Sequence, residues 1–265
     1  MKKFKQPLTI DQQISHLESS KKVVFQYITK SDAYDYLLKF NYINVITPFK
    51  HVFAEKSKNL RLEKDQNGNH IYQKSTEFEN YVMLYRNERS TYSNIFQCIS
   101  KFETIFNAVF SYEVVINYDL SNEKRIADFM LSLKFNSQKY YEGQKAMVNI
   151  VHSIDTLEKS IQDIGNIFVS FDRLSLNNLC NIFKVLNMPN KISIFNILKR
   201  YDCTLNFEDF HTFESNFFRI VGIRNAVYHN NSLEILTRFY NFKNGELRNS
   251  SDQKKYRNLI KKLNV

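Results

Sequence analysis

Arginine, asparagine and histidine lie within six residues of one another near the end of a long expected helix. The stretch reads Arg224-Asn225-Ala226-Val227-Tyr228-His229, and the run around it is otherwise apolar. At about 100° per residue, Asn225 and His229 lie one turn apart on the same stripe, whereas Arg224 lies about 140° around the helix from His229. These side chains therefore border a shared groove and do not form one flat face.

These three residue types could cleave a phosphodiester bond without a metal ion. A histidine can move the proton of a ribose 2′-hydroxyl, an arginine can stabilise the charge that builds on phosphorus, and an asparagine can orient either of them. A helix ending at Asn230 or Asn231 leaves His229 in its last turn, where free carbonyl groups and the helix dipole favour a protonated imidazole. The spacing alone leaves an alternative open, in which Arg224 and His229 are only a charged cap.

The pattern R-N-x-x-x-H resembles the R-x4-6-H motif of HEPN domains, helical modules that include many RNases of toxin and phage-defence systems. The rest of the sequence resembles the abortive-infection (Abi) family of the AbiD/AbiF type. The opening segment of that family is similar to residues 5–14, and its Asn-Tyr and Pro-Phe pairs are similar to Asn41-Tyr42 and Pro48-Phe49. A family segment that leads along one helix to an Ile-Glu pair resembles the run 84–103, in which the matching residues are Tyr85, Glu88, Ile99, Phe102 and Glu103.

The chain departs from the family pattern at a few positions. Asn87, Thr91 and Tyr92 stand where the family usually has Phe, Leu and Arg, so a basic contact expected from this helix is missing or supplied elsewhere. Tyr228 replaces a residue that is usually small. Neither departure touches the Arg-Asn-His set itself.

The resemblance implies a HEPN-like helical bundle in which two protomers bring their motif helices together across a two-fold axis. It also implies a metal-independent endoribonuclease that acts as a toxin in phage defence. Arg224, Asn225 and His229 are then catalytic, and Glu103 is an acid that faces Arg224 or His229. If Glu103 packs against His229, it could orient the imidazole and favour its charged form. Glu103 could equally lie on a solvated flank of its helix.

The charge of the chain favours an anionic partner. Its net charge is +10 and its pI is near 9.3, although an AT-rich genome also produces a Lys- and Asn-rich composition. The segment 240–265 carries seven basic and two acidic residues, and we expect a short helix there, capped by Asp252, with one basic face. The candidates for RNA contact at the two basic ends are Lys2, Lys3, Lys5, Lys254, Lys255, Arg257, Lys261 and Lys262.

The composition predicts an all-α fold, because 5 Gly and 3 Pro in 265 residues are too few for a turn-rich β protein. A helical pattern starts near Glu77, a further helix is capped by Ser121, and a longer one runs from about residue 140 to Ile164. Two apolar stripes are the clearest: Ile95, Ile99, Phe102, Phe106 and Val109 in one helix, and Phe210, Phe213, Phe217 and Val221 in the helix that leads to Arg224.

Residues 1–75 are expected to form a small N-terminal unit and linker, followed by a HEPN-like helical domain over 76–265. Thr9 and Gln12 make a capping box for the first helix. Ser31 is the expected cap of the second helix, with Tyr34, Leu37 and Leu38 inward. A short hairpin is expected across Asn67-Gly68, with Leu60 and Leu62 facing Ile71 and Tyr72.

The sequence lacks the motifs of several classes of enzyme and metal-binding protein. Cys98, Cys180 and Cys203 form no C-x-x-C pair, and no Gly-rich phosphate loop or H-E-x-x-H motif is visible. We expect no cofactor and no metal. No signal peptide or spanning helix is visible, which predicts a cytoplasmic protein without membrane contact. The resemblance to the Abi family implies RNA as partner, both as substrate and as a small structured inhibitor, and a second copy of the chain. Two rival hypotheses are a non-catalytic RNA-binding HEPN protein and a regulatory dimerisation module.

Overall fold

The computed structural model describes residues 7–58, 61–66, 69–72, 74–138, 144–201, 205, 207–237 and 250–263. These residues fall into two compact units. One comprises the chain up to Ile95 together with a C-terminal segment that begins at Asn225, and the other comprises Phe96–Arg224. This division differs from the boundary expected near residue 75, because Ser232 and Glu234 of the C-terminal segment bond to Glu88.

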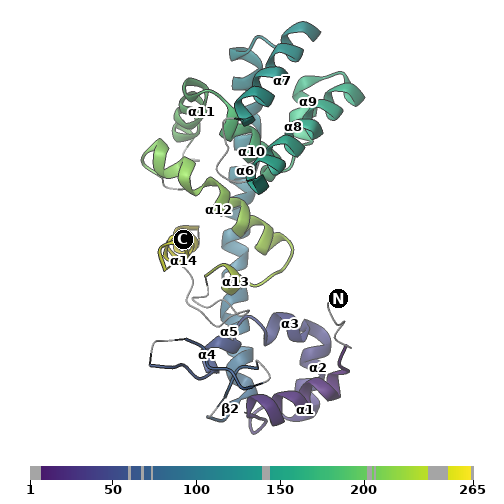
Figure 1. Ribbon diagram of the computed structural model, residues 1–265, viewed down its shortest axis with the longest axis vertical. Helices are drawn as coiled ribbons and strands as arrows, with labels where there is room; N and C mark the ends of the chain where they lie inside the picture. The colour runs from purple at the N-terminus through teal and green to yellow at the C-terminus, as the bar shows by residue number, and fades with distance from the viewer. Residues whose placement is uncertain are drawn as a thin grey trace. The chain divides into compact units, whose positions relative to one another are not determined.

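Helices make up most of the described part of the chain, and its two named strands form one short parallel sheet, so the predicted all-α class is confirmed (Figure 1). In the first unit, Val23 pairs with Thr76 and Val24 with Glu77. The elements of this unit are α1 (Ile10–Lys21), β1 (Val23–Val24), α2 (Lys30–Phe40), α3 (Tyr42–Val45), α4 (Lys50–Phe53), β2 (Thr76–Glu77), α5 (Phe78–Ser90), α13 (Glu234–Thr237) and α14 (Ser250–Leu263). The second unit contains α7 (Glu123–Gln138), α8 (Gln144–Ile164), α9 (Ile167–Asp172), α10 (Leu176–Val185) and α11 (Met188–Arg200), and the division between the units falls within α6 (Tyr92–Asn117) and α12 (Phe210–Tyr228).

The first two helices of the chain show how capping sets their limits. The predicted capping box is confirmed, because the Thr9 amide donates to Gln12 Oε1 at 2.9 Å and the Gln12 amide to Thr9 Oγ1 at 3.3 Å. The predicted cap at Ser31 is wrong. Thr29 caps α2, since its Oγ1 accepts from the Asp32 amide at 3.2 Å.

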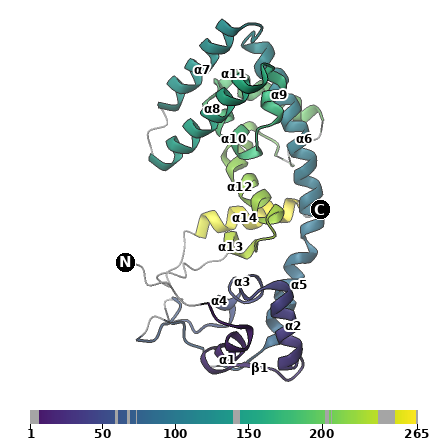
Figure 2. The same cartoon turned by 90° about the vertical axis from the view of Figure 1, so that its right-hand side faces the viewer.

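The inward face of α2 also differs from the prediction. Leu37 is buried as expected, but Leu38 is 65% exposed and Tyr34 is 37% exposed. Ala33, one turn before Leu37, completes the buried stripe instead. Figure 2 shows α1 and α2 beside one another, and the core of this unit is completed by Phe78, Tyr81, Val82 and Tyr85 of α5.

The segment before β2 has the pairing expected of a hairpin. Lys64 lies opposite His70, and the Ile71 amide donates to the Glu63 carbonyl oxygen at 3.1 Å. Leu62 and Tyr72 are buried together against Ala54. The tip residues Asn67-Gly68 and the neighbouring Leu60 lie outside the described residues, as do Lys2, Lys3, Lys5 and Cys203.

A cluster of phenylalanine rings forms the centre of the second unit. Phe106 of α6 lies 4.8 Å from Phe217 of α12 between ring centroids, and Phe183 of α10 lies 5.5 Å from Phe217. Phe102 and Phe213 complete the contacts with edge-to-face or tilted rings. Both predicted apolar stripes are therefore confirmed, and they lock α6 and α12 to the same core.

The caps of two further helices differ from the prediction. Asn122, not Ser121, caps α7, because its Oδ1 accepts from the Arg125 amide at 3.1 Å. Helix α14 begins at Ser250, so Asp252 lies in its first turn and is not its cap. In α8, Ile150, Ile154 and Leu157 are buried, while Met147, Val151 and Ile161 stay partly exposed.

The two cysteines within the described residues differ in their surroundings. Cys180 is buried in α10, and burial raises the pKa of its thiol to about 12. Cys98 is half-buried in α6, and burial raises the pKa of its thiol as well. No helix in the described part of the chain is long and apolar enough to cross a bilayer.

Neighbouring phenylalanines in α12 provide a matched test of the aromatic core. Phe217 is 1% exposed and Phe218 is 42% exposed. Phe217→Ala should lower the free energy of unfolding by about 3–5 kcal/mol, because it removes a ring from the centre of the cluster. Phe218→Ala should change it by less than about 1 kcal/mol. Urea unfolding followed by circular dichroism measures both, and equal losses would contradict this arrangement of α12.

Candidate functional site

Helix α12 carries the motif and is fixed at both of its ends. Its first turn is capped by Asp209, whose Oδ1 accepts from the Thr212 amide at 2.8 Å. The last helical residue is Tyr228, slightly earlier than predicted, so His229 is the residue that follows the helix.

The end of α12 is a Schellman-type turn with asparagine in the place usually taken by glycine. Asn230 has a φ of +55°, and the Asn231 amide donates to the Ala226 carbonyl oxygen at 2.8 Å. The His229 amide still donates to the Asn225 carbonyl oxygen at 3.1 Å, so His229 keeps a helical hydrogen bond. Its side chain is exposed, whereas that of Asn225 is partly buried. The imidazole is therefore presented to solvent from a backbone of defined geometry.

Arg224 belongs to the second unit, where it is held by a carboxylate from α6. Its Nη2 lies 3.1 Å from Glu103 Oε1, and its Nε lies 3.2 Å from Glu103 Oε2. Both side chains are about one-fifth exposed. This two-point geometry fixes the plane of the guanidinium group and balances its charge. The structure thus joins Glu103 to Arg224, one of the two partners that the sequence left open.

The segment after His229 is held by side chains of α5 and the start of α6. Arg89 donates through Nη2 to the Asn230 carbonyl oxygen at 2.8 Å and through Nη1 to Asn230 Oδ1. The hydroxyl of Tyr92 donates to the Asn231 carbonyl oxygen and accepts from the Leu233 amide at 3.3 Å. The Arg89 guanidinium lies 4.4 Å from the centre of the Tyr92 ring, which restricts both side chains.

These contacts answer a question that the sequence left open. A basic contact seemed to be missing from this helix, since Tyr92 stands where the Abi pattern usually has arginine. Arg89, at the end of α5, supplies a basic contact, and Tyr92, at the start of α6, makes a polar contact of its own. Sequence reasoning missed both roles. The signal that could have found them is the Asn230-Asn231 pair, because asparagine directly after a helix often adopts positive φ and exposes carbonyl groups that need donors.

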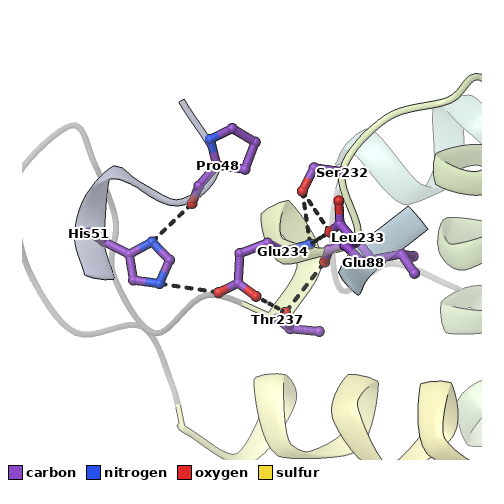
Figure 3. A network of polar contacts seen from close by, with 7 residues as sticks. All are labelled: Pro48, His51, Glu88, Ser232, Leu233, Glu234 and Thr237. Atoms are coloured by element: carbon purple, nitrogen blue, oxygen red, sulfur yellow. Dashed lines mark hydrogen bonds and ion pairs between the residues drawn. The ribbon is translucent and has the colours of Figure 1, made fainter. Parts of the chain in front are cut away.

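A second polar network continues along this segment (Figure 3). Glu88 Oε1 accepts from Ser232 Oγ and from the Glu234 amide, both at 2.7 Å. Glu234 Oε1 in turn lies 3.1 Å from Nε2 of His51 in α4. The other ring nitrogen of His51 lies 2.9 Å from the Pro48 carbonyl oxygen.

The chemistry of these groups requires a proton between His51 and Glu234. The Pro48 carbonyl oxygen can only accept, so Nδ1 of His51 carries a hydrogen. Nε2 then faces a carboxylate oxygen, which is also an acceptor unless it is protonated. The contact between His51 and Glu234 ties α4 to α13, beyond the end of the motif helix.

The basic C-terminal helix has the predicted one-sided charge. Lys254, Lys255, Lys261 and Lys262 are exposed on α14, and Arg257 is partly exposed. Gln253, Leu259 and Leu263 are buried on the opposite side. Figure 2 shows α14 next to α13, which it contacts. Within the described ranges, no three His, Cys, Asp or Glu side chains lie close enough together to hold a metal ion.

The partly buried Glu88 makes the stability of this segment depend on pH. Burial raises the pKa of Glu88 above its usual 4.5, although the hydrogen bonds from Ser232 and Glu234 oppose the shift. The native state therefore holds more protons here than the unfolded chain. The stability from this group is full below the unfolded pKa and is lost as the pH rises through the raised value.

Glu88→Gln should consequently raise the free energy of unfolding at neutral pH, because glutamine keeps an acceptor for Ser232 without a buried charge. The gain should shrink as the pH falls toward 4.5. Urea unfolding at about pH 5 and about pH 8 measures the difference. Glu79→Gln, a partly exposed change on the same helix, is the control. A gain that does not depend on pH would contradict the buried charge.

The comparisons with known proteins support one family. The family model for Abi-like proteins matches residues 35–233, a range that includes Glu88, Glu103 and the whole R-N-x-x-x-H stretch. A search of curated proteins found no match, and a search of solved structures found none either. Because the matched range covers most of the chain, the protein belongs to the Abi-like family, which implies a part in abortive infection as a defence against phage.

Proposed function

We propose that this protein is a metal-independent endoribonuclease of the HEPN type, acting as a toxin in the cytoplasm during phage defence. Membership of the Abi-like family supports the defence role. One observation carries the nuclease role: His229 is exposed at a rigidly capped helix end, five residues after an arginine that a carboxylate holds in a fixed plane. A charge cap alone would not need the guanidinium plane to be fixed.

The proposed reaction is transfer of a phosphodiester within the RNA. His229 takes the proton from a ribose 2′-hydroxyl, and the 2′-oxygen forms a new bond to phosphorus while the bond from phosphorus to the 5′-oxygen breaks. The leaving 5′-oxygen receives a proton from a second, protonated histidine. The products are a 2′,3′-cyclic phosphate and a 5′-hydroxyl. Arg224 stabilises the negative charge that grows on the phosphate oxygens, and Asn225 orients the reacting groups.

A homodimer accounts for the second histidine. On one helix, Arg224 and His229 lie about 140° apart, which surrounds a single phosphate poorly. Two α12 helices related by a two-fold axis would present two copies of each residue to one phosphate. Glu103 then has a positioning role. It engages two of the five N–H donors of Arg224, and the substrate phosphate must use others or compete for these.

Cleavage of RNA in EDTA tests the proposal. Arg224→Ala and His229→Ala should each slow cleavage at least about 100-fold, because each removes a group that acts on the transition state. The matched controls are Arg173→Ala and His152→Ala, which change an exposed arginine and an exposed histidine outside the motif. Mapping of the 3′ ends should show cyclic phosphates with the wild-type protein and both controls. Equal rates for His229→Ala and the wild type would overturn the assignment.

The exposed lysines of α14 favour a second candidate, an RNA-binding protein without catalysis. Together with Lys2, Lys3 and Lys5, they are also the candidate contact for a small inhibitory RNA. If Lys254, Lys255, Lys261 and Lys262 contact phosphates, replacing all four by alanine should reduce the slope of log affinity against log salt by about 3. Fluorescence anisotropy with a labelled structured RNA measures this slope. An unchanged slope would remove α14 as an RNA contact.

A further inference from the structure

A cleft of about 670 Å³ lies between α2 and α5, within the first unit of the chain. This volume is in the range of sites for small molecules. The cleft combines aromatic and basic side chains from both helices: Tyr36, Lys39 and Phe40 from α2, and Tyr85, Arg86 and Arg89 from α5. None of these residues is assigned a role by the R-N-x-x-x-H motif, so the cleft needs an explanation of its own.

The aromatic rings form a continuous surface in this cleft. The Tyr36 and Phe40 rings lie 4.7 Å apart between centroids, and Phe40 lies 5.5 Å from Tyr85. Tyr85 is buried, whereas Tyr36 and Phe40 are only partly buried. The two rings of α2 therefore keep exposed surface above a fixed base. A partly exposed pair of rings is suited to stacking a planar ligand, and every nucleobase offers such a plane.

Two exposed cations stand beside these rings. Lys39 Nζ lies 5.2 Å from the centre of the Phe40 ring, and the Arg86 guanidinium lies 5.7 Å from that of Tyr36. Neither side chain is buried, so each can pair with an external anion without a large desolvation cost. Burial raises the pKa of Tyr36, although Arg86 opposes the shift, and the hydroxyl therefore remains a hydrogen-bond donor at neutral pH.

Two carboxylates narrow the choice of ligand. Asp32 and Asp35 of α2 also line the cleft. Asp32 is engaged in capping its own helix, since it accepts from Thr29 Oγ1 at 2.6 Å. Asp35 is exposed and could accept a hydrogen bond from an exocyclic amino group. The negative charges of Asp32 and Asp35 disfavour the closely spaced phosphates of a duplex. They are compatible with a single nucleotide, which has an aromatic base with an amino group at one end and a phosphate at the other.

We propose that this cleft binds one unpaired nucleotide of the RNA substrate, with an amino-bearing base stacked on Tyr36 and Phe40 and its phosphate held by Lys39 and Arg86. The inference rests on the proposed function only in naming the ligand as substrate RNA. Arg89 links the cleft to the motif, because it lines the cleft and also holds Asn230, the residue after His229. A nucleotide in the cleft would thus be bound in the same unit as His229, and on the same α5 framework.

Anisotropy with short labelled RNAs tests the cleft in the full-length His229→Ala protein, in which cleavage of the probe should be at least about 100-fold slower. Tyr36→Leu and Arg86→Ala should each weaken binding of a single-stranded oligocytidine about tenfold. Tyr34→Leu, on the same helix but outside the cleft, and Arg61→Ala, an exposed arginine of the same unit, should bind as the parent does. Thermal melting checks that all four variants fold alike.

Two further probes separate stacking from charge. An RNA of equal length with abasic sites keeps its phosphates, so Tyr36→Leu should bind it as well as the parent, while Arg86→Ala should still be weakened. A duplex of equal length should bind weakly and be insensitive to both changes. Two results would overturn the proposal. One is that Tyr36→Leu weakens binding of the abasic RNA as much as binding of oligocytidine, and the other is that both variants bind oligocytidine as tightly as the parent.

The nuclease assay distinguishes this failure from failure of the proposed function. If the wild type cleaves RNA and Tyr36→Leu cleaves it with the same KM, the cleft proposal fails and the nuclease stands. If Tyr36→Leu raises KM with little change in kcat, the cleft contributes substrate binding, as proposed. If oligocytidine binds in the cleft while no RNA is cleaved, the nucleotide site stands and the nuclease assignment fails.

Discussion

The end of α12 depends on donors that come from a distant part of the chain. A helix leaves its last carbonyl groups without partners, and the positive φ of Asn230 turns the following backbone toward α5. Arg89 and Tyr92 then donate to the carbonyl groups of Asn230 and Asn231. Without these donors, the turn would have to satisfy its carbonyl groups from solvent, and His229 would lose its fixed place at the helix end.

The segment after His229 also packs against Glu88, and its hydrogen bonds offset part of the cost of burying that carboxylate. Glu88 is partly buried, and its buried Oε2 has no hydrogen-bond partner within the described residues. Its other oxygen accepts from Ser232 Oγ and from the Glu234 amide, and Glu234 Oε1 lies 3.1 Å from His51 Nε2. His51 of α4, Glu234 of α13 and Glu88 of α5 are thus joined into one polar network. Such a network resists the removal of any single member, because each loss leaves another buried polar group unpaired.

The sequence predicted what is periodic or local, and it missed what is distant. Phe213 and Phe217 recur at helical spacing, so their burial could be foreseen. Leu37 and Leu38 are adjacent and equally apolar, and only the covering elements decide that Leu37 is the buried one. Arg89 and Asn230 are 141 positions apart, and no local pattern signals their contact. The R-N-x-x-x-H stretch could be found in the sequence because Arg, Asn and His are an unusual set in an apolar run. The residues that hold it, such as Arg89, are of common types and follow no local pattern.

The pairing of Arg224 with Glu103 bears on how such a site could be controlled. An arginine that is already balanced by a carboxylate attracts a phosphate less strongly than an unpaired one, because the two charges cancel at a distance. The pair is only about one-fifth exposed, so solvent screens it weakly. If RNA is the substrate, as proposed, it has to bring binding energy from elsewhere to engage Arg224. The proposed nucleotide cleft between α2 and α5 would provide such energy from aromatic and basic side chains outside the motif.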